Sequence, residues 1–204
     1  TVYLKINRNS YLLKNLKLNN DIELENLECA ITCCLALNIN EKKIIKVLSK
    51  VNNPPGRLET IEYKKRNSKI VIDYAHTPDA LKKILNVYKI KNKKPALLFG
   101  CGGDRDKNKR KTMGIIANKF ASKIYITDDN PRNENPSNIR KNILKYCPRA
   151  IEIPDRKKAI KLAIQEIKMN EILIIAGKGH EKIQIIKNKK IKLDDFEIVK
   201  QLTN

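Results

Sequence analysis

The chain has 204 residues, which at about 150 residues per domain suits one domain and part of another. It carries 43 Lys and Arg against 22 Asp and Glu, a formal charge of +21, and 41% of its residues are hydrophobic. That hydrophobic content can fill a packed core and argues against a disordered polybasic tail. No apolar run reaches the roughly 18 residues of a membrane span, and the first residues lack a signal-peptide pattern. We expect a folded, non-secreted protein of the cytoplasm.

Five cysteines and two histidines follow no familiar metal-ligand spacing, so no zinc site is expected. Cys29, Cys33 and Cys34 lie among apolar residues, and we interpret them as small core residues of a helix. The lysines are spread along the chain together with many Ile and Asn, and Trp is absent. This pattern is typical of AT-rich coding and lacks the aromatic platform of single-strand binders. We therefore expect neither nucleic acid nor a membrane as a partner, although a role for the charge stays open.

The first quarter of the chain has a different pattern from the rest. Residues 1–25 alternate apolar and polar side chains and predict short strands joined by turns. Residues 26–37 predict an apolar helix, and residues 41–51 predict an amphipathic one. Residues 52–56 read Asn-Asn-Pro-Pro-Gly, the strongest breaker cluster of the sequence. We expect a domain boundary there, with residues 1–54 and 55–204 on its two sides.

Strand and helix patterns alternate regularly after the boundary. Strands are predicted at 69–75, 95–100, 123–128, 150–153 and 171–177, and helices at 78–88, 111–121, 136–146 and 156–168. A hairpin at 182–186 and 190–193 and a helix opening at Asp194 follow. This alternation predicts an α/β fold with a mostly parallel sheet.

The unusual residues of the sequence follow the predicted strands. Both histidines and five of the seven glycines fall in the loops 73–79, 100–106 and 177–181, and two further loops follow at 128–132 and 154–156. Each loop also has a purely structural explanation, such as a tight turn, an Asx-turn or a solvated charge. Ligands of parallel sheets bind at the carboxyl ends of the strands, so the shared position favours a binding site.

These loops offer charges of both signs. Arg105 and Arg132 suit carboxylate or phosphate groups. The carboxylates suit ammonium groups or Mg²⁺ and are Asp104, Asp106, Asp129 and Glu181. A site of this kind fits a zwitterion such as an amino acid. The sequence contains no nucleophile elbow and no G-x-x-x-x-G-K-[ST] loop, so we assign no catalytic residue and no metal ligand.

Five ordered motifs resemble those of the Mur ligase family, in particular the members that add the third residue of the peptidoglycan stem peptide. They are P-G-R-L-E at 55–59, V-I-D-Y-A-H-T-P-D-A-L at 71–81, F-G-C-G-G-D-R-D at 99–106, T-D-D-N-P-R at 127–132 and A-G-K-G-H-E at 176–181. The resemblance implies that residues 1–54 end a central ATP-binding domain and that residues 55–204 form a Rossmann-like C-terminal domain. It places the phosphate-binding loop upstream of Thr1, so the chain alone is expected to be inactive.

The resemblance implies an ATP-dependent ligase that forms an amide through an acyl phosphate. Its expected substrates are meso-diaminopimelate and UDP-N-acetylmuramoyl-L-alanyl-D-glutamate, with ATP and with Mg²⁺ held mainly by the upstream part, in a monomer. The implied nucleotide-binding residues are Asn26, Arg57, Asp73 and His76. The implied diaminopimelate-binding residues are Arg105, Asp129, Asn130, Pro131, Arg132, Gly177 and Glu181.

Other functions stay open at this point. A lysine-adding Mur ligase or a folylpolyglutamate synthetase-like ligase shares the architecture, although the Asp-Asn-Pro-Arg loop ending at Arg132 favours diaminopimelate. A basic nucleic-acid-binding module and an amino-acid-binding domain without catalysis are the remaining alternatives.

Overall fold

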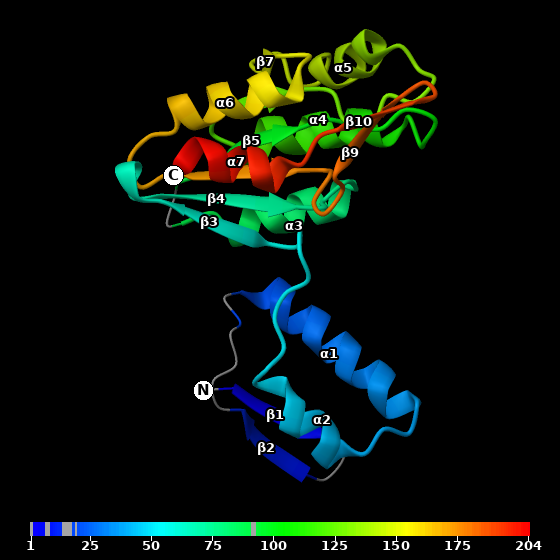
Figure 1. Ribbon diagram of the computed structural model, residues 1–204, viewed down its shortest axis with the longest axis vertical. Helices are drawn as coiled ribbons and strands as arrows, with labels where there is room; N and C mark the ends of the chain where they lie inside the picture. The colour runs from blue at the N-terminus through cyan, green and yellow to red at the C-terminus, as the bar shows by residue number, and fades with distance from the viewer. Residues whose placement is uncertain (1, 7–8, 14–17, 19, 91–92) are drawn as a thin grey trace. The chain divides into compact units, whose positions relative to one another are not determined.

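The computed structural model describes residues 2–6, 9–13, 18, 20–90 and 93–204 (Figure 1). The chain forms two compact units, Thr1–Pro54 and Pro55–Asn204, which divide inside the Asn-Asn-Pro-Pro-Gly cluster. That the first unit ends an ATP-binding domain stays a prediction. No helix within the described ranges has the length and apolar content needed to cross a membrane.

The first unit combines a hairpin with two helices. Strands β1 (Val2–Ile6) and β2 (Asn9–Leu13) pair antiparallel, and helices α1 (Asp21–Ala36) and α2 (Glu41–Leu48) follow. Its small core consists of Ile6, Leu27, Ile31, Ile44 and Leu48. The predicted strand pattern at Leu16 lies outside the described residues.

Helix α1 corrects two expectations. It begins at Asp21 rather than at residue 26, because the Asn20 side chain accepts a hydrogen bond from the Glu23 amide and caps the helix. Leu27 and Ile31, one turn apart, form its buried face. Cys29 and Cys33 each lie two residues beyond these, on the opposite face, and are exposed. Only Cys34 packs against the small core, so the interpretation of all three cysteines as core residues was wrong.

The second unit is built on a six-stranded sheet with the order β3-β4-β8-β5-β6-β7. Every neighbouring pair is parallel except β3–β4, which confirms the predicted α/β fold with a mostly parallel sheet. The strands are β3 (Glu59–Tyr63), β4 (Ser68–Asp73), β5 (Ala96–Phe99), β6 (Ile124–Ile126), β7 (Ile151–Glu152) and β8 (Ile172–Ala176). The parallel strands therefore end at one edge of the sheet. The antiparallel edge strand β3 and the short 3-10 helix Lys64–Arg66 were not predicted.

Helices cover both faces of this sheet (Figure 1). One face carries α3 (Pro78–Val87), α4 (Lys109–Phe120) and α5 (Pro136–Leu144), which contact one another in that order. The other face carries α6 (Arg156–Glu166) and α7 (Asp195–Thr203), joined to the strands by one apolar cluster. Successive side chains of a strand point to opposite faces, and Ile70 and Ile72 of β4 belong to that cluster while Val71 between them is also buried.

The predicted caps hold this arrangement. The side chains of Thr77, Asp155 and Asp194 accept hydrogen bonds from the first-turn amides of α3, α6 and α7. The hairpin of β9 (Ile183–Ile186) and β10 (Lys189–Lys192) is present and forms a sheet of its own. It reaches the main sheet's edge through Arg132, which forms a bridge with Ile186.

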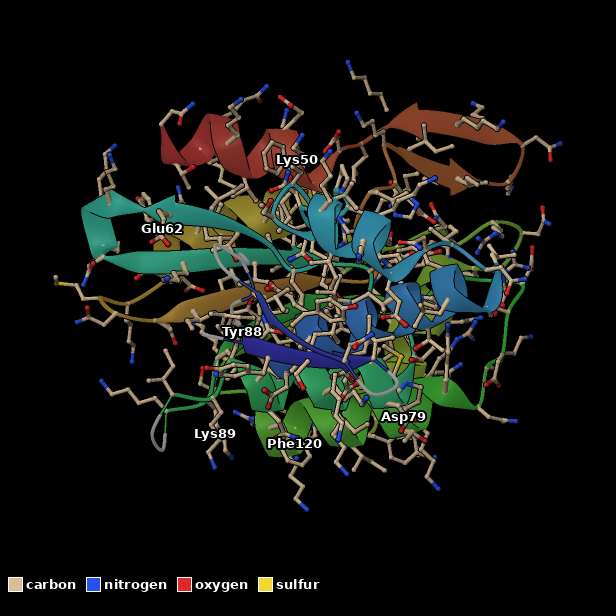
Figure 2. The ribbon with its side chains drawn as sticks, turned by 90° about the horizontal axis from the view of Figure 1, so that it is seen from below. Lys50, Glu62, Asp79, Tyr88, Lys89 and Phe120 are labelled. Atoms are coloured by element: carbon tan, nitrogen blue, oxygen red, sulfur yellow. The ribbon has the colours of Figure 1, made fainter. Side chains whose placement is uncertain are left out.

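Basic side chains are dispersed over the elements. In Figure 2, nitrogen-tipped side chains project from helices and strands around the outline. The labelled Glu62 on β3 pairs with Lys69 at 3.1 Å, and both side chains are more than half exposed.

Candidate functional site

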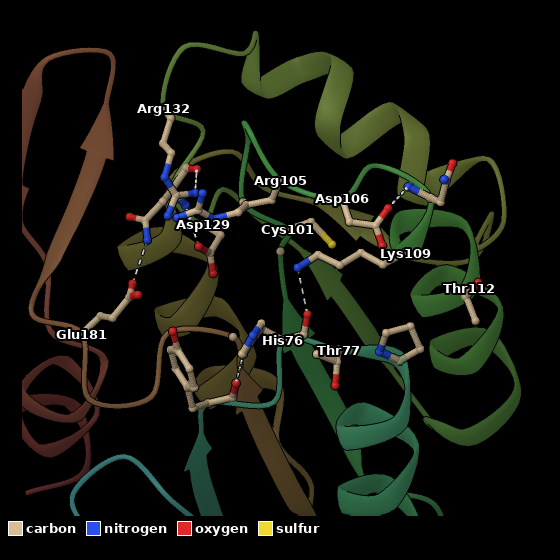
Figure 3. A pocket seen from close by; sticks show the side chains of 17 residues that line it. His76, Thr77, Cys101, Arg105, Asp106, Lys109, Thr112, Asp129, Arg132 and Glu181 are labelled. Carbon is tan, nitrogen blue, oxygen red and sulfur yellow. Dashed lines mark hydrogen bonds between the residues drawn. The ribbon is translucent and has the colours of Figure 1, made fainter.

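A pocket of about 610 Å³ lies at the carboxyl edge of the main sheet (Figure 3). It is lined by the loops that follow β4, β5, β6 and β8 and by the first turns of α3 and α4. The structure therefore brings together Arg105, Asp129, Asn130, Arg132, Gly177 and Glu181 of the predicted amino-acid site, and also His76. Arg132, Asp129 and Glu181 lie on one side of the pocket, and Lys109 and Thr112 lie on the other.

The glycines after β5 allow two loops to approach closely. A Cβ atom on Gly103 would lie 1.9 Å from the carbonyl oxygen of Pro131, a backbone atom that cannot yield. A Cβ on Gly102 would make one close contact, with the Nη1 atom of Arg132 at 2.8 Å, and ordinary contacts with the Asn130 carbonyl oxygen and Arg105 Cγ. The Gly-Cys-Gly-Gly segment thus packs directly against the Asp-Asn-Pro-Arg loop. Pro131, predicted to bind the ligand, is buried under this contact and does not line the pocket.

Arg132 is fixed through both its backbone and its side chain. Its φ of 50° is left-handed, and its amide donates to the Ile185 carbonyl while its own carbonyl accepts from Lys187. Its Nη1 atom donates to the Gly103 carbonyl at 2.9 Å and to the Asn130 carbonyl at 3.3 Å. Nε and Nη2 have no hydrogen-bond partner among the described residues, which leaves an edge of the guanidinium for a ligand carboxylate.

Glu181 reaches the same side of the pocket from the loop after β8. Its Oε2 atom accepts from Asn130 Nδ2 at 2.7 Å and from Lys178 Nζ at 3.1 Å. Its Oε1 atom has no partner within the described ranges, and the side chain is 28% exposed. A carboxylate oxygen and a guanidinium edge thus face one cavity from two different loops, as a zwitterionic ligand requires.

Asp129 and Gly177 close the floor of the pocket. The Asp129 Oδ1 atom accepts from the Asn130 amide, and the Asp129 carbonyl accepts from Gln184. Gly177 has a φ of 111°, and a Cβ there would lie 2.8 Å from Asp129 Oδ2. A side chain at position 177 is therefore excluded by backbone conformation and by space.

Three basic side chains gather around the ring of Tyr74, a residue that sequence reasoning did not single out. The guanidinium of Arg57 lies 4.5 Å from the centre of its ring, and the rings of His76 and His180 lie at 4.5 Å and 5.0 Å. The Nδ1 atom of His76 is 2.8 Å from the Tyr74 carbonyl. The tyrosine thus gathers a cation and two imidazoles from three loops at the rim of the pocket. Lys109, also missed, donates to the His76 carbonyl from across the pocket.

Asp73 performs a local structural task. Its two carboxylate oxygens accept from the amides of Leu58 and Ala75, and Leu58 is held at a φ of 50°. Burial raises the pKa of the Asp73 carboxyl above its usual value, and these two hydrogen bonds and Arg57 offset only part of that rise. Asp73 does not line the pocket. Asn26 lies exposed on α1 in the other unit. The predicted nucleotide contacts of both stay predictions.

The thiol that lines the pocket is poorly suited to act as a nucleophile. Cys101 is buried beside Met113, with the two sulfur atoms 3.7 Å apart. Burial raises the pKa of this thiol to about 12, so the reactive thiolate is scarce at physiological pH. Within the described residues, no three His, Cys, Asp or Glu side chains gather in a way that could hold a metal ion.

Residues 56–179 match the family described as Mur ligase, glutamate ligase domain. The chain belongs to the Mur ligase family. Over 182 residues it is 44% identical to the UDP-N-acetylmuramoyl-L-alanyl-D-glutamate–2,6-diaminopimelate ligase of Anaplasma marginale, a match that covers 88% of this chain and 37% of that protein. The chain thus spans little more than a third of the length of this curated relative.

Solved structures of other proteins share this fold. A structure of a UDP-N-acetylmuramoyl-L-alanyl-D-glutamate–2,6-diaminopimelate ligase, 33% identical, aligns with a TM-score of 0.68 over 95% of this chain and 40% of its own. A folylpolyglutamate synthase from Thermotoga maritima aligns with a TM-score of 0.58 at 20% identity, over 84% of this chain and 39% of its own. The second likeness extends to the fold alone. The predicted resemblance to Mur ligases is therefore confirmed.

Proposed function

We propose that this chain supplies the amino-acid site of an ATP-dependent ligase that joins meso-diaminopimelate to UDP-N-acetylmuramoyl-L-alanyl-D-glutamate. The observation that carries the proposal is the pairing of Arg132 and Glu181 in one pocket, each with ligand-facing atoms that no described residue engages. The name of the relatives at 44% and 33% identity supports the choice of substrate.

The proposed roles follow from the chemistry of meso-diaminopimelate, which resembles lysine with a second carboxylate on its far carbon. Arg132 offers Nε and Nη2 to that carboxylate, and Glu181 Oε1 accepts from the neighbouring ammonium. Arg105, exposed on the loop after β5, offers a second cation to the other carboxylate. Held at both ends, the ligand presents its remaining amine toward the open part of the pocket. Orientation of this kind supplies several kcal/mol of a ligation barrier.

The nucleotide side of the proposal rests on the rim of the pocket. Arg57, stacked on Tyr74, is an exposed cation suited to phosphate, and the ring of His76 lies against the same tyrosine. ATP supplies the phosphoryl group that activates the stem-peptide carboxylate as an acyl phosphate, which the amine of the bound amino acid then attacks. Mg²⁺ would be held mainly by residues outside this chain. We place the enzyme in the cytoplasm, where nucleotide substrates are available, and expect it to act as a monomer.

The test uses the full polypeptide that carries this chain. It is incubated with ATP, Mg²⁺, the UDP-muramoyl dipeptide and either meso-diaminopimelate or L-lysine, and the product is identified by mass. The proposal predicts ADP release and a tripeptide product with meso-diaminopimelate. A product formed with L-lysine alone would instead support the lysine-adding alternative, and the absence of any ligated product would contradict both.

Binding to nucleic acid is tested separately. The basic residues behind the +21 charge are spread along the sequence, so we expect no retardation of duplex DNA at physiological salt. Retardation that persists at that salt would favour the nucleic-acid-binding alternative.

A further inference from the structure

Lys178 is a lysine with no solvent exposure, placed behind the proposed amino-acid site. It lies in the loop after β8, three residues before Glu181, and its neighbours in sequence are the two glycines of the Gly-Lys-Gly run. A buried ammonium is costly unless all of its donors are engaged. The contacts of the Lys178 ammonium therefore indicate why a charged side chain lies at this buried position.

The three contacts of the Lys178 ammonium join three segments. Nζ donates to Asn130 Oδ1 at 3.3 Å, to Glu181 Oε2 at 3.1 Å and to the Ile183 carbonyl at 2.5 Å. These acceptors belong to the loop after β6, the loop after β8 and strand β9. An ammonium has three donor hydrogens, so Lys178 is fully satisfied and offers nothing to a ligand.

The same contacts fix which way the Asn130 amide points. Two donors, Lys178 Nζ and the Ile185 amide at 2.9 Å, meet one end of this amide, so that end is the oxygen. The nitrogen end then faces Glu181 and donates to it at 2.7 Å. Without Lys178 the Asn130 oxygen would keep only the Ile185 amide as a donor, so two contacts rather than three would hold this orientation.

We propose that Lys178 is a positioning residue that holds the Asn130 amide together with the Ile185 amide and reserves a single oxygen of Glu181 for the ammonium group of the incoming amino acid. Lys178 and Asn130 both occupy Oε2, so Oε1 alone faces the pocket. This inference rests on the proposed function, because it assigns the ligand ammonium to Glu181.

The kinetic test uses Lys178→Met in the full polypeptide, with Lys190→Met as the matched control. Lys190 is an exposed lysine on β10 of the neighbouring hairpin. We expect Lys178→Met to raise the KM for meso-diaminopimelate at least about tenfold, in line with the loss of a charged hydrogen bond, while the KM for ATP and the control variant stay within about twofold. An unchanged KM for meso-diaminopimelate in a folded Lys178→Met protein would overturn the inference.

A double-mutant cycle separates positioning from general support of the fold. If Lys178 acts through Asn130, then adding Lys178→Met to Asn130→Ala should raise the KM for meso-diaminopimelate much less than Lys178→Met does alone. Fully additive effects would contradict the proposed route. If Lys178→Met does not fold, Lys178→Gln, which removes the charge but keeps two donor hydrogens, is used in its place and should raise the KM for meso-diaminopimelate in the same direction.

A spectroscopic measurement tests the inference apart from the proposed function. The Asn130 side-chain amide of the ¹⁵N-labelled protein should exchange slowly with solvent, and Lys178→Met should make it exchange faster. Identical exchange in both proteins would overturn the role of Lys178. A wild-type protein that shows the slow exchange but never uses meso-diaminopimelate would instead contradict the proposed function, and with it the assignment of the ligand ammonium to Glu181.

Discussion

Arg156 and Asp195 form a bidentate ion pair in which neither side chain has any solvent exposure. Nη2 of Arg156 lies 2.7 Å from Asp195 Oδ2, and Nε lies 2.9 Å from Oδ1. Nη2 also donates to the carbonyl of Ala176, the residue before Gly177. The pair therefore connects the C-terminal helix α7 to α6 and to the end of β8, directly behind the pocket.

Asp195→Ala should destabilise the protein strongly. The substitution leaves the Arg156 guanidinium buried and unpaired, which costs about 3–5 kcal/mol. Urea unfolding of the 204-residue chain measures the change in the free energy of unfolding. Glu62→Ala is the control, because it breaks an exposed pair with Lys69 and should cost at most about 1 kcal/mol. Equal effects of the two substitutions would mean that the buried pair does not stabilise this fold.

Gly103→Ala and Gly102→Ala should differ although they are neighbours. A methyl group at 103 meets the Pro131 carbonyl at 1.9 Å, so the two loops must separate, which we expect to cost more than about 2 kcal/mol of stability. A methyl group at 102 makes its one close contact with the end of the Arg132 side chain. Gly102→Ala should therefore leave the unfolding free energy within about 1 kcal/mol and weaken ligand binding instead. Thermal unfolding compares the two, and a stable Gly103→Ala would contradict the docked arrangement of these loops.

The cysteines should separate into two reactivity classes. Cys29 and Cys33 are exposed, whereas Cys101 and Cys147 are buried and burial raises the pKa of both thiols. Burial raises the pKa of the Cys101 thiol to about 12, so its reactive thiolate is scarce near neutral pH. A disulfide reagent at mildly alkaline pH should modify Cys29 and Cys33 rapidly. Modification of Cys101 should need unfolding or a pH close to its pKa, and labelling of Cys101 as fast as that of Cys29 in the folded chain would contradict its burial.

Much of this fold could be predicted because its signals are local. Continuous apolar runs give the buried strands, and Thr77, Asp155 and Asp194 mark helix starts through side chains that cap the next few amides. The edge strand β3 was missed because no continuous apolar run marks it in the sequence. It is defined by its antiparallel pairing with β4. Its burial alternates only between partly buried and exposed positions.

The site could be predicted in position but not in its supporting contacts. The loops at the carboxyl edge followed from the alternation of predicted strands and helices, whereas Lys178 looked like one lysine among many. The acceptors that bind its buried ammonium include Asn130, which lies 48 residues upstream. Arg156 and Asp195 are 39 residues apart, and no local pattern links them. Such contacts depend on the packing of the whole sheet edge.

Arg132→Ala in the full polypeptide should affect one substrate selectively. Arg132 provides the cation proposed for the distal carboxylate of meso-diaminopimelate, and losing one partner of a buried charge pair costs about 2–5 kcal/mol. The KM for meso-diaminopimelate should therefore rise by about 30-fold or more, while the KM for ATP stays nearly unchanged. Lys187→Ala is the control, because Lys187 is exposed in the turn between β9 and β10 and bonds Arg132 only through its backbone amide. An equal rise in both KM values would assign Arg132 to the fold rather than to the ligand.

We propose that the pocket lined by Arg132 and Glu181 is selective for meso-diaminopimelate. The most direct test compares the kcat/KM of the unmodified full polypeptide for meso-diaminopimelate and for L-lysine, at saturating ATP and UDP-muramoyl dipeptide. A ligand without the distal carboxylate leaves Arg132 unpaired, so we predict a preference for meso-diaminopimelate of about 30-fold or more. Comparable kcat/KM values for the two amino acids would contradict the assignment of Arg132 and the account of the site.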